Sequence, residues 1–131
     1  FSGSNYAGAE IGHTVINVDG EPCTCGRKGC FEAYCSATAL VKFTKRSIEQ
    51  NPSSLMVRFA EKEGKISGRT AFNAAKEGDQ AGREVVDLFI KNLSCGIINT
   101  INVFQPNILC IGGGVSNEGD NLLIPLKERI S

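Results

Sequence analysis

The chain has 131 residues, of which 41% are hydrophobic, and its fourteen basic side chains balance fourteen acidic ones. This length is sufficient for one domain with its own core. A neutral balance gives no support for a nucleic-acid-binding surface, which needs net positive charge, and no apolar run reaches the roughly 20 residues of a membrane span.

The first ten residues, FSGSNYAGAE, have the composition of the middle of a loop, and no secretory signal peptide is visible. Because the chain starts at Phe1, we expect that an upstream portion of the protein is missing. Residues 11–20 are rich in valine and isoleucine and end in the turn-forming pair Asp19-Gly20. This pattern predicts a short strand closed by a turn.

A cluster of cysteines follows. Cys23, Cys25 and Cys30 lie within eight residues, and His13, the single histidine of the chain, precedes Cys23 with nine residues between them. Thiolate sulfur and imidazole nitrogen are preferred ligands of tetrahedral Zn²⁺, at roughly 2.0–2.3 Å. Three cysteines and one histidine leave no coordination position open for water, so the pattern predicts a structural zinc site.

A disulfide scaffold is the alternative, because six cysteines is an even number. Cys23 and Cys25 are separated by one residue and are poorly placed to bridge each other. Cys95 and Cys110 fall in apolar segments, where a free cysteine behaves as a small buried hydrophobe, and Cys35 has no obvious partner. We therefore favour a metal site, with reduced structural thiols as the second choice, in the reducing environment of the cytoplasm.

The middle of the chain has the three- and four-residue spacing of apolar side chains that predicts helices. One helix runs from about residue 32 to residue 50 and ends at Asn51-Pro52. A second begins after Ser54 as its cap and stops near Gly64, and a third covers about residues 70–77. The basic side chains of this region are most simply solvated helix faces.

The longest predicted helix begins after Asp79, a good N-cap, and is closed by Pro106. Its apolar stripe keeps the helix period along its whole length. Gly96 in the middle costs about 1 kcal/mol relative to alanine, so we expect another backbone to approach closely there.

Residues 108–111 are a short apolar run that predicts a strand buried on both faces, and residues 122–130 predict a further helix. Between them, Gly112, Gly113 and Gly114 form a turn after the strand, where open α/β sheets bind ligands. The turn matches neither a dinucleotide-binding fingerprint nor a P-loop. A phosphate-binding backbone and a simple tight turn are therefore equally favoured by the residues alone.

Two glutamates flank the metal ligands. Glu10 precedes His13 by three residues, and Glu32 follows Cys30 by two. A glutamate near a loop is usually a solvated surface charge, but a carboxylate is also a good acceptor for paired hydroxyls. A polyhydroxy ligand is the functional alternative, and His13 could contact it through the ring nitrogen that does not bind metal.

Taken together, the motifs E-x-G-H at residues 10–13, C-x-C-G-x-x-G-C-x-E at residues 23–32 and I-G-G-G at residues 111–114 resemble the ROK family of bacterial sugar kinases and sugar-responsive repressors. The resemblance implies an α/β fold, namely a partial actin-like ATPase (ribonuclease H-like) lobe that is rich in helices and carries a zinc-binding loop. Residues 1–35 would be the sugar-contact and zinc loop, and residues 36–131 the helices, the buried strand and the glycine-rich nucleotide turn.

The same resemblance assigns roles to individual residues. It implies that the structural zinc ligands are His13, Cys23, Cys25 and Cys30. It implies that the sugar contacts are Glu10, His13 and Glu32. The turn that faces the nucleotide would be Gly112, Gly113 and Gly114. The family's catalytic aspartate and its phosphate-binding loop match nothing in this chain and are expected upstream. We therefore assign no catalytic residue, and we expect the isolated chain to be inactive.

The resemblance predicts the C-terminal portion of a cytoplasmic, glucokinase-like hexose kinase that transfers the γ-phosphoryl group of ATP, with Mg²⁺, to a hydroxyl of glucose. It also implies a homodimer, with no membrane or nucleic-acid contact from this portion. The alternative is the sugar-sensing half of a ROK-type transcriptional repressor. A third reading, a zinc-stabilised interaction module without a ligand, is disfavoured by the positions of the two glutamates.

Overall fold

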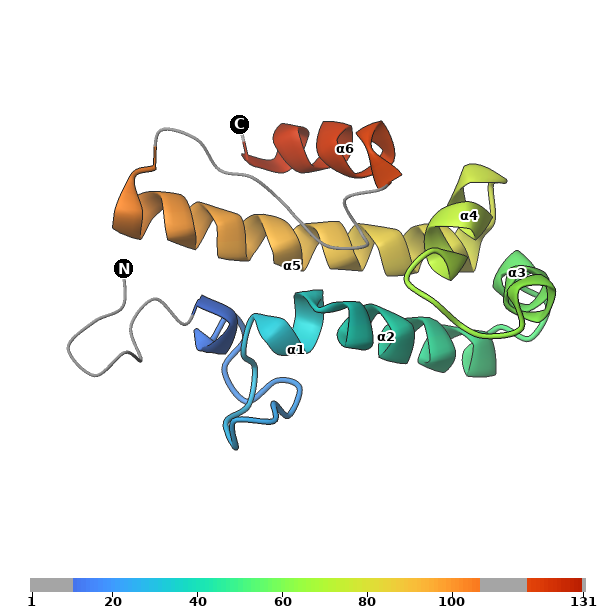
Figure 1. Cartoon of the computed structure of the whole chain (residues 1–131), viewed down its shortest axis with the longest axis horizontal. Helices are drawn as coiled ribbons and strands as arrows, with labels where there is room; N and C mark the ends of the chain where they lie inside the picture. The colour runs from blue at the N-terminus through green and yellow to red at the C-terminus, as the bar shows by residue number, and fades with distance from the viewer. Residues whose placement is uncertain (1–10, 107–117, 131) are drawn as a thin grey trace.

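A single long helix organises the molecule, and the other helices pack around it (Figure 1). The computed structural model describes residues 11–106 and 118–130. The described elements are one short 3₁₀ helix and six α-helices, in the order η1 Ile11–His13, α1 Glu32–Cys35, α2 Ala37–Gln50, α3 Leu55–Glu63, α4 Thr70–Lys76, α5 Gln80–Phe104 and α6 Asp120–Ile130.

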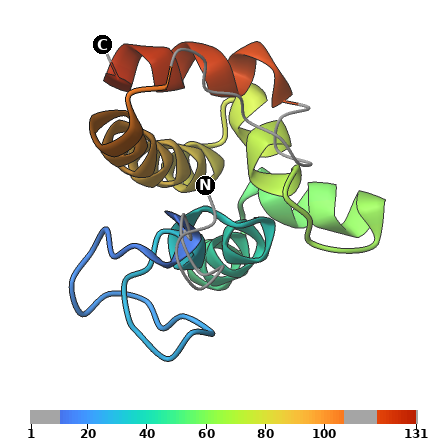
Figure 2. The ribbon, with the colours of Figure 1, turned by 60° about the vertical axis from the view of Figure 1, so that its left-hand side comes forward.

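Helix α5 lies between two layers. Helix α6 packs along one side of it, and α1 and α2 pack along the other, while α3 and α4 gather near its N-terminal end (Figures 1 and 2). The faces that meet are apolar, and they form one buried cluster that includes Leu40, Phe72, Phe89, Ile90 and Leu122. The rings of Phe72 and Phe89 meet edge to face, with centroids 6.2 Å apart.

Helix α5 begins at the predicted cap. The side chain of Asp79 accepts a hydrogen bond of 2.9 Å from the backbone amide of Gly82. The helix ends at Phe104, where Gln105 adopts a left-handed conformation with φ of 47° before Pro106. The boundaries predicted from the sequence for this helix are therefore confirmed.

The carboxylate of Asp79 also binds the start of a second helix. The Ser54 hydroxyl donates to it at 2.6 Å, and the Leu55 amide, the first of α3, donates at 3.1 Å. Partial burial alone would raise the pKa of Asp79, but these hydrogen bonds and the one from Gly82 outweigh it and hold the pKa below its usual range. One carboxylate thus joins the N-termini of α3 and α5.

The other predicted helices are also confirmed, with one difference. The segment 32–50 is not continuous, because it breaks at Ser36 into α1 and α2. Ser36 has an extended conformation, and its hydroxyl accepts a hydrogen bond of 3.0 Å from the amide of Ala39. It is therefore an N-cap inside a stretch whose apolar spacing alone predicts a single helix.

The strand predicted within residues 11–20 is wrong. The segment begins with η1, and Val15 makes only an isolated antiparallel bridge with Cys30. The amides of Ile16 and Asn17 both donate to the carbonyl of Gly29, at 2.8 and 3.3 Å, so the alternating pattern of a ladder is not formed. The predicted turn is present, with Asp19 at a φ of 59°.

The described residues contain no named strand, only two isolated bridges. The predicted strand 108–111, with Cys110, and the glycines at 112–114 lie outside the described residues. The described ranges therefore supply the helical part of the predicted α/β fold.

The expectation for Gly96 needs a correction. A Cβ atom at this position would lie 2.3 Å from the ring of Phe31, so the close neighbour is a side chain rather than a backbone. A close backbone approach occurs instead at Gly82, where a Cβ atom would lie 3.0 Å from the amide nitrogen of Ala75. Both glycines allow α5 to pack closely against neighbouring segments.

Within the described ranges, none of the helices has the length and apolar character needed to cross a membrane.

Candidate functional site

The predicted metal ligands lie at or beside a loop, residues 14–31, that projects from the N-terminal end of the α1–α2 layer (Figure 2). The two arms of the loop are joined by backbone hydrogen bonds. The Gly29 amide donates to Glu21 at 2.7 Å, and the Phe31 amide donates to Thr14 at 2.8 Å. A second isolated bridge pairs Pro22 with Lys28. The loop is therefore a paired structure whose end lies at residues 23–27.

The structure brings all four predicted metal ligands together. The ligand atoms of His13, Cys23, Cys25 and Cys30 all lie within 4.8 Å of one another. The Sγ atom of Cys23 is 3.6 Å from Nδ1 of His13, and the Sγ atoms of Cys25 and Cys30 are also 3.6 Å apart. Cys30 is fully buried, Cys23 and His13 are half-buried, and Cys25 is exposed.

The two ligand pairs at 3.6 Å have the separation expected around a tetrahedral ion. Ligand bonds of roughly 2.0–2.3 Å place the ligand atoms of a tetrahedral site about 3.3–3.8 Å apart. The turn at the end of the loop supports the same geometry, because the Gly26 amide donates to the Cys23 carbonyl at 3.0 Å with Gly26 at a φ of 92°. The donor set and its spacing therefore fit a metal ion of the zinc type.

The chemistry of the thiols agrees with this fit. The five cysteines within the described ranges are free, so no disulfide competes for the cluster there. Burial, and then the neighbouring Cys25 and Cys23 thiols, raise the pKa of Cys30 to about 11. The Cys30 thiol is therefore protonated without a cation, and a bound metal ion would favour its thiolate form.

Of the predicted sugar contacts, the structure brings His13 and Glu32 together, and Glu10 lies outside the described residues. The Oε2 atom of Glu32 is 3.6 Å from Nδ1 of His13. Glu32 begins α1, and its side chain is 49% exposed. A carboxylate that faces solvent directly beside the ligand cluster can accept hydrogen bonds from a bound molecule.

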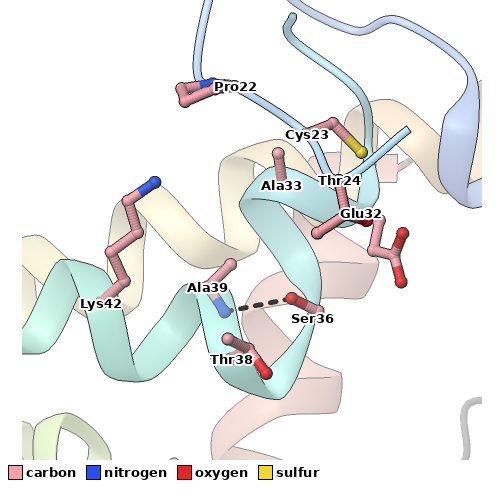
Figure 3. Close-up of a pocket in the computed structure, with 9 residues that line it drawn as sticks. All are labelled: Pro22, Cys23, Thr24, Glu32, Ala33, Ser36, Thr38, Ala39 and Lys42. Atoms are coloured by element: carbon pink, nitrogen blue, oxygen red, sulfur yellow. Dashed lines mark hydrogen bonds between the residues drawn. The ribbon is translucent and has the colours of Figure 1, made fainter. Parts of the chain in front are cut away.

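A hollow of about 280 Å³ opens between the loop and the start of α2 (Figure 3). Cys23 and Glu32 lie near each other on one side of it, and Lys42 lies further along α2. Hydroxyl groups complete its polar lining, from Thr24, Ser36 and Thr38. The hollow adjoins the carboxylate of Glu32, although the sequence pattern suggested only a solvated helix face at Lys42.

Sequence reasoning also missed the residues that hold the loop on the helices. The hydroxyl of Tyr34 accepts hydrogen bonds from Asn17 Nδ2 at 2.8 Å and from the Glu21 amide at 3.0 Å. The Glu21 carboxylate forms ion pairs with Lys42 and Arg46 of α2. The position of Tyr34, two residues after Glu32, was the available signal, but its partners lie 17 and 13 residues away in the sequence.

The predicted nucleotide turn, Gly112–Gly114, lies outside the described residues. Glu118 is the first described residue after this turn. It is buried and pairs with Lys76 of α4, with 3.1 Å between Oε2 of Glu118 and Nζ of Lys76. This pair connects the end of α4 to the residue that leads into α6.

The chain is similar to known proteins of one family. The sequence pattern of the ROK family matches residues 1–131 of the chain. The chain is 36% identical over 129 residues to a glucokinase of Thermotoga maritima and 30% identical over 131 residues to a xylose repressor of Caldicellulosiruptor bescii. It covers 41% and 33% of the lengths of these proteins, so it spans less than half of either relative.

A solved structure agrees with the sequence comparison. It is a ROK family glucokinase from Streptomyces griseus in complex with glucose and AMPPNP, with a TM-score of 0.80 and 31% identity. The match covers 93% of this chain and 40% of the other. The helical arrangement described above is therefore similar to that of the corresponding part of this solved structure.

Proposed function

Because this chain belongs to the ROK family, we propose that it forms the C-terminal, sugar-binding portion of an ATP-dependent hexose kinase that acts on glucose. The observation that carries the proposal is the position of Glu32, 3.6 Å from His13 at the edge of the cysteine cluster. The similarity to glucokinases of Thermotoga maritima and Streptomyces griseus supports the choice of reaction and substrate.

The first part of the proposal is a structural zinc ion. His13, Cys23, Cys25 and Cys30 would hold it through Nδ1 and three Sγ atoms, whose spacing fits tetrahedral coordination. When bound, the ion supplies a cross-link between the loop and η1 and takes no part in phosphoryl transfer. A closed set of four protein ligands leaves no position for a reacting water molecule.

The second part is the sugar contact. Glu32 would accept hydrogen bonds from hydroxyl groups of the sugar, and its place at the first turn of α1 keeps the carboxylate beside His13. Glu10 is proposed as a further acceptor on the basis of the E-x-G-H motif. These contacts would orient one hydroxyl of the sugar for attack on the γ-phosphoryl group of ATP·Mg²⁺, so their contribution to catalysis is positioning.

The third part concerns the nucleotide. Gly112, Gly113 and Gly114 are proposed to face ATP, which is supported by their place between a predicted buried strand and α6. The general base is proposed to lie upstream, in an actin-like lobe that this chain completes. In this account residues 1–35 form the sugar-contact and zinc loop, residues 36–131 form the remaining part of the lobe, and the intact protein is a cytoplasmic homodimer.

A sugar-responsive repressor is the second candidate. It is supported by the xylose repressor of Caldicellulosiruptor bescii and by the regulator NagC of Escherichia coli, which are 30% and 31% identical to this chain. The identity to two glucokinases is higher, at 36% and 37%, so we favour the kinase.

The two functions are separated by an assay of the intact protein for sugar-dependent release of ADP from ATP. Glucose and xylose are tested in parallel, with ATP and Mg²⁺. The kinase proposal expects ADP release and a phosphorylated sugar with glucose. Binding of a sugar without any ADP release would contradict it, and a change in DNA binding caused by that sugar would establish the repressor.

A further inference from the structure

We propose that Tyr34 is a positioning residue that fastens the metal-binding loop to α1 and α2, and thereby keeps the metal ligands in register with Glu32. The inference rests on the proposed zinc and sugar sites and adds a residue to which no role in them has been assigned. The side chain of Tyr34 contacts Asn17 and Glu21 of the loop and Phe43 of α2, so it would act on the metal ligands through the loop.

A single oxygen atom joins the loop turn to the helix. Tyr34 lies on α1, two residues after Glu32, and is 7% exposed. Its hydroxyl oxygen accepts from Asn17 Nδ2 and from the Glu21 amide, which lie on either side of the turn at Asp19. A phenolic oxygen can accept two hydrogen bonds, so both sides of the turn are held at once.

The surroundings of this oxygen leave it little freedom. The ring of Tyr34 stacks on Phe43 of α2, with centroids 5.9 Å apart and planes 19° apart. On the other side, a Cβ atom at Gly20 would lie only 2.2 Å from the hydroxyl oxygen. The helix layer fixes the ring, and the turn closes directly over the hydroxyl group.

Glu21 transmits this attachment to the metal ligands. Its amide donates to Tyr34, its carbonyl accepts from the Gly29 amide at 2.7 Å, and its carboxylate pairs with Lys42 and Arg46 of α2. Glu21 lies two residues before Cys23, and Gly29 directly precedes Cys30. A shift of Glu21 would therefore move ligands on both arms of the loop relative to Glu32.

The test is the rate of zinc release from the intact protein to a chromogenic chelator, measured for Tyr34→Phe and wild type. The substitution keeps the ring and its stacking on Phe43 but removes the acceptor of two hydrogen bonds. We expect zinc release to accelerate about tenfold or more, because two donors lose their partner. The KM for glucose should rise, while the KM for ATP stays close to that of wild type.

Thr44→Val is the matched control. Thr44 is fully buried on α2, and its hydroxyl donates to the Leu40 carbonyl at 2.8 Å. The variant also loses a buried hydroxyl, but from a position whose hydrogen bond stays within α2. It should lower the melting temperature without changing zinc release or the KM for glucose. Equal acceleration in both variants would reduce the effect of Tyr34 to general stability and overturn the inference.

The remaining outcomes are also decisive. Unchanged zinc release in Tyr34→Phe, from a protein that carries zinc in its wild-type form, overturns the role of Tyr34 alone. Wild-type protein without zinc overturns the metal proposal and this inference together. If Tyr34→Phe does not fold, Glu21→Gln provides the second variant, because it weakens the ion pairs with Lys42 and Arg46 while keeping the amide. Glu21→Gln should also accelerate zinc release, and a release rate equal to that of wild type would overturn the inference.

Discussion

At the scale of single residues, the five cysteines within the described ranges divide into two groups with different surroundings. Cys23, Cys25 and Cys30 face one another across the end of the loop. Cys35 packs against the apolar core, and burial, followed by the nearby Cys95 thiol, raises its pKa to about 12. A thiol of this kind stays protonated and unreactive at neutral pH.

This difference predicts opposite behaviour for two serine substitutions. Cys30→Ser removes a buried ligand, so the zinc content should fall from about one equivalent per chain to less than about half. The thermal stability should fall as well, because a structural metal contributes directly to folding. Cys35→Ser should retain zinc. Both are checked by metal analysis of protein purified without added zinc. Equal zinc in the two variants would contradict the proposed ligand set.

Gly96 gives a prediction about packing. A methyl group on this residue would meet the Phe31 ring at 2.3 Å, so Gly96→Ala should lower the free energy of unfolding by about 1–3 kcal/mol through overpacking, measured by urea denaturation. Phe31→Leu in the same chain should recover part of this loss, because the smaller side chain makes room. A double variant no more stable than Gly96→Ala would show that the ring is not the obstacle.

The metal ligands could be predicted from the sequence because all four have the side-chain chemistry and short spacing of a zinc site. Tyr34 could not. Its role depends on contacts with Asn17 and Glu21 that exist only after the loop has folded back on α1. Gly96 was singled out correctly, but a glycine in a helix does not reveal whether a backbone or an aromatic ring approaches it.

At the scale of helices and loops, capping residues made the boundaries predictable. Ser54, Gly64 and Asp79 occupy the capping positions at which the sequence places them. The errors arose where tertiary contacts override the local pattern. Ser36 divides one apolar repeat into two helices, and the segment 11–20 forms the loop arm because its amides converge on the Gly29 carbonyl instead of pairing in a ladder.

The shared cap at Asp79 leads to a prediction about stability. Its carboxylate accepts from the Gly82 and Leu55 amides and from the Ser54 hydroxyl, so Asp79→Ala should lower the free energy of unfolding by about 2 kcal/mol, more than a single cap would cost. Asp79→Ser retains a cap for α5 and should lose less. Equal stability of wild type and Asp79→Ala in urea denaturation would show that the shared cap contributes nothing.

The same carboxylate makes this contribution depend on pH. Its pKa is lower in the folded protein than its ordinary value of 3.8, so folding favours the ionised form. The stabilisation is complete above the unfolded pKa and is lost as the pH falls through the folded pKa. The difference between wild type and Asp79→Ala should therefore be constant near neutral pH and shrink below about pH 4.

At the scale of the whole molecule, a helical layer on each side of α5 fixes where the functional loop can be. Helices α1 and α2 pack on α5, and the loop is attached to them through Tyr34, Glu21 and the start of α1 (Figure 1). The sequence predicted most of the helices and the family resemblance, which the family match confirms. It did not predict how the loop is fastened, because that depends on contacts between distant segments.

The central claim is that the surface around Glu32, beside the metal-binding loop, is a sugar site. Its most direct test is the dissociation constant for glucose, measured by titration calorimetry on the intact protein. Glu32→Gln keeps the size of the side chain but removes the charge that would accept hydrogen bonds from sugar hydroxyls. Glu49→Gln, an exposed carboxylate on α2, is the matched control. The account predicts about tenfold or more weaker binding for Glu32→Gln and no change for Glu49→Gln. Equal affinity of Glu32→Gln and wild type would contradict it.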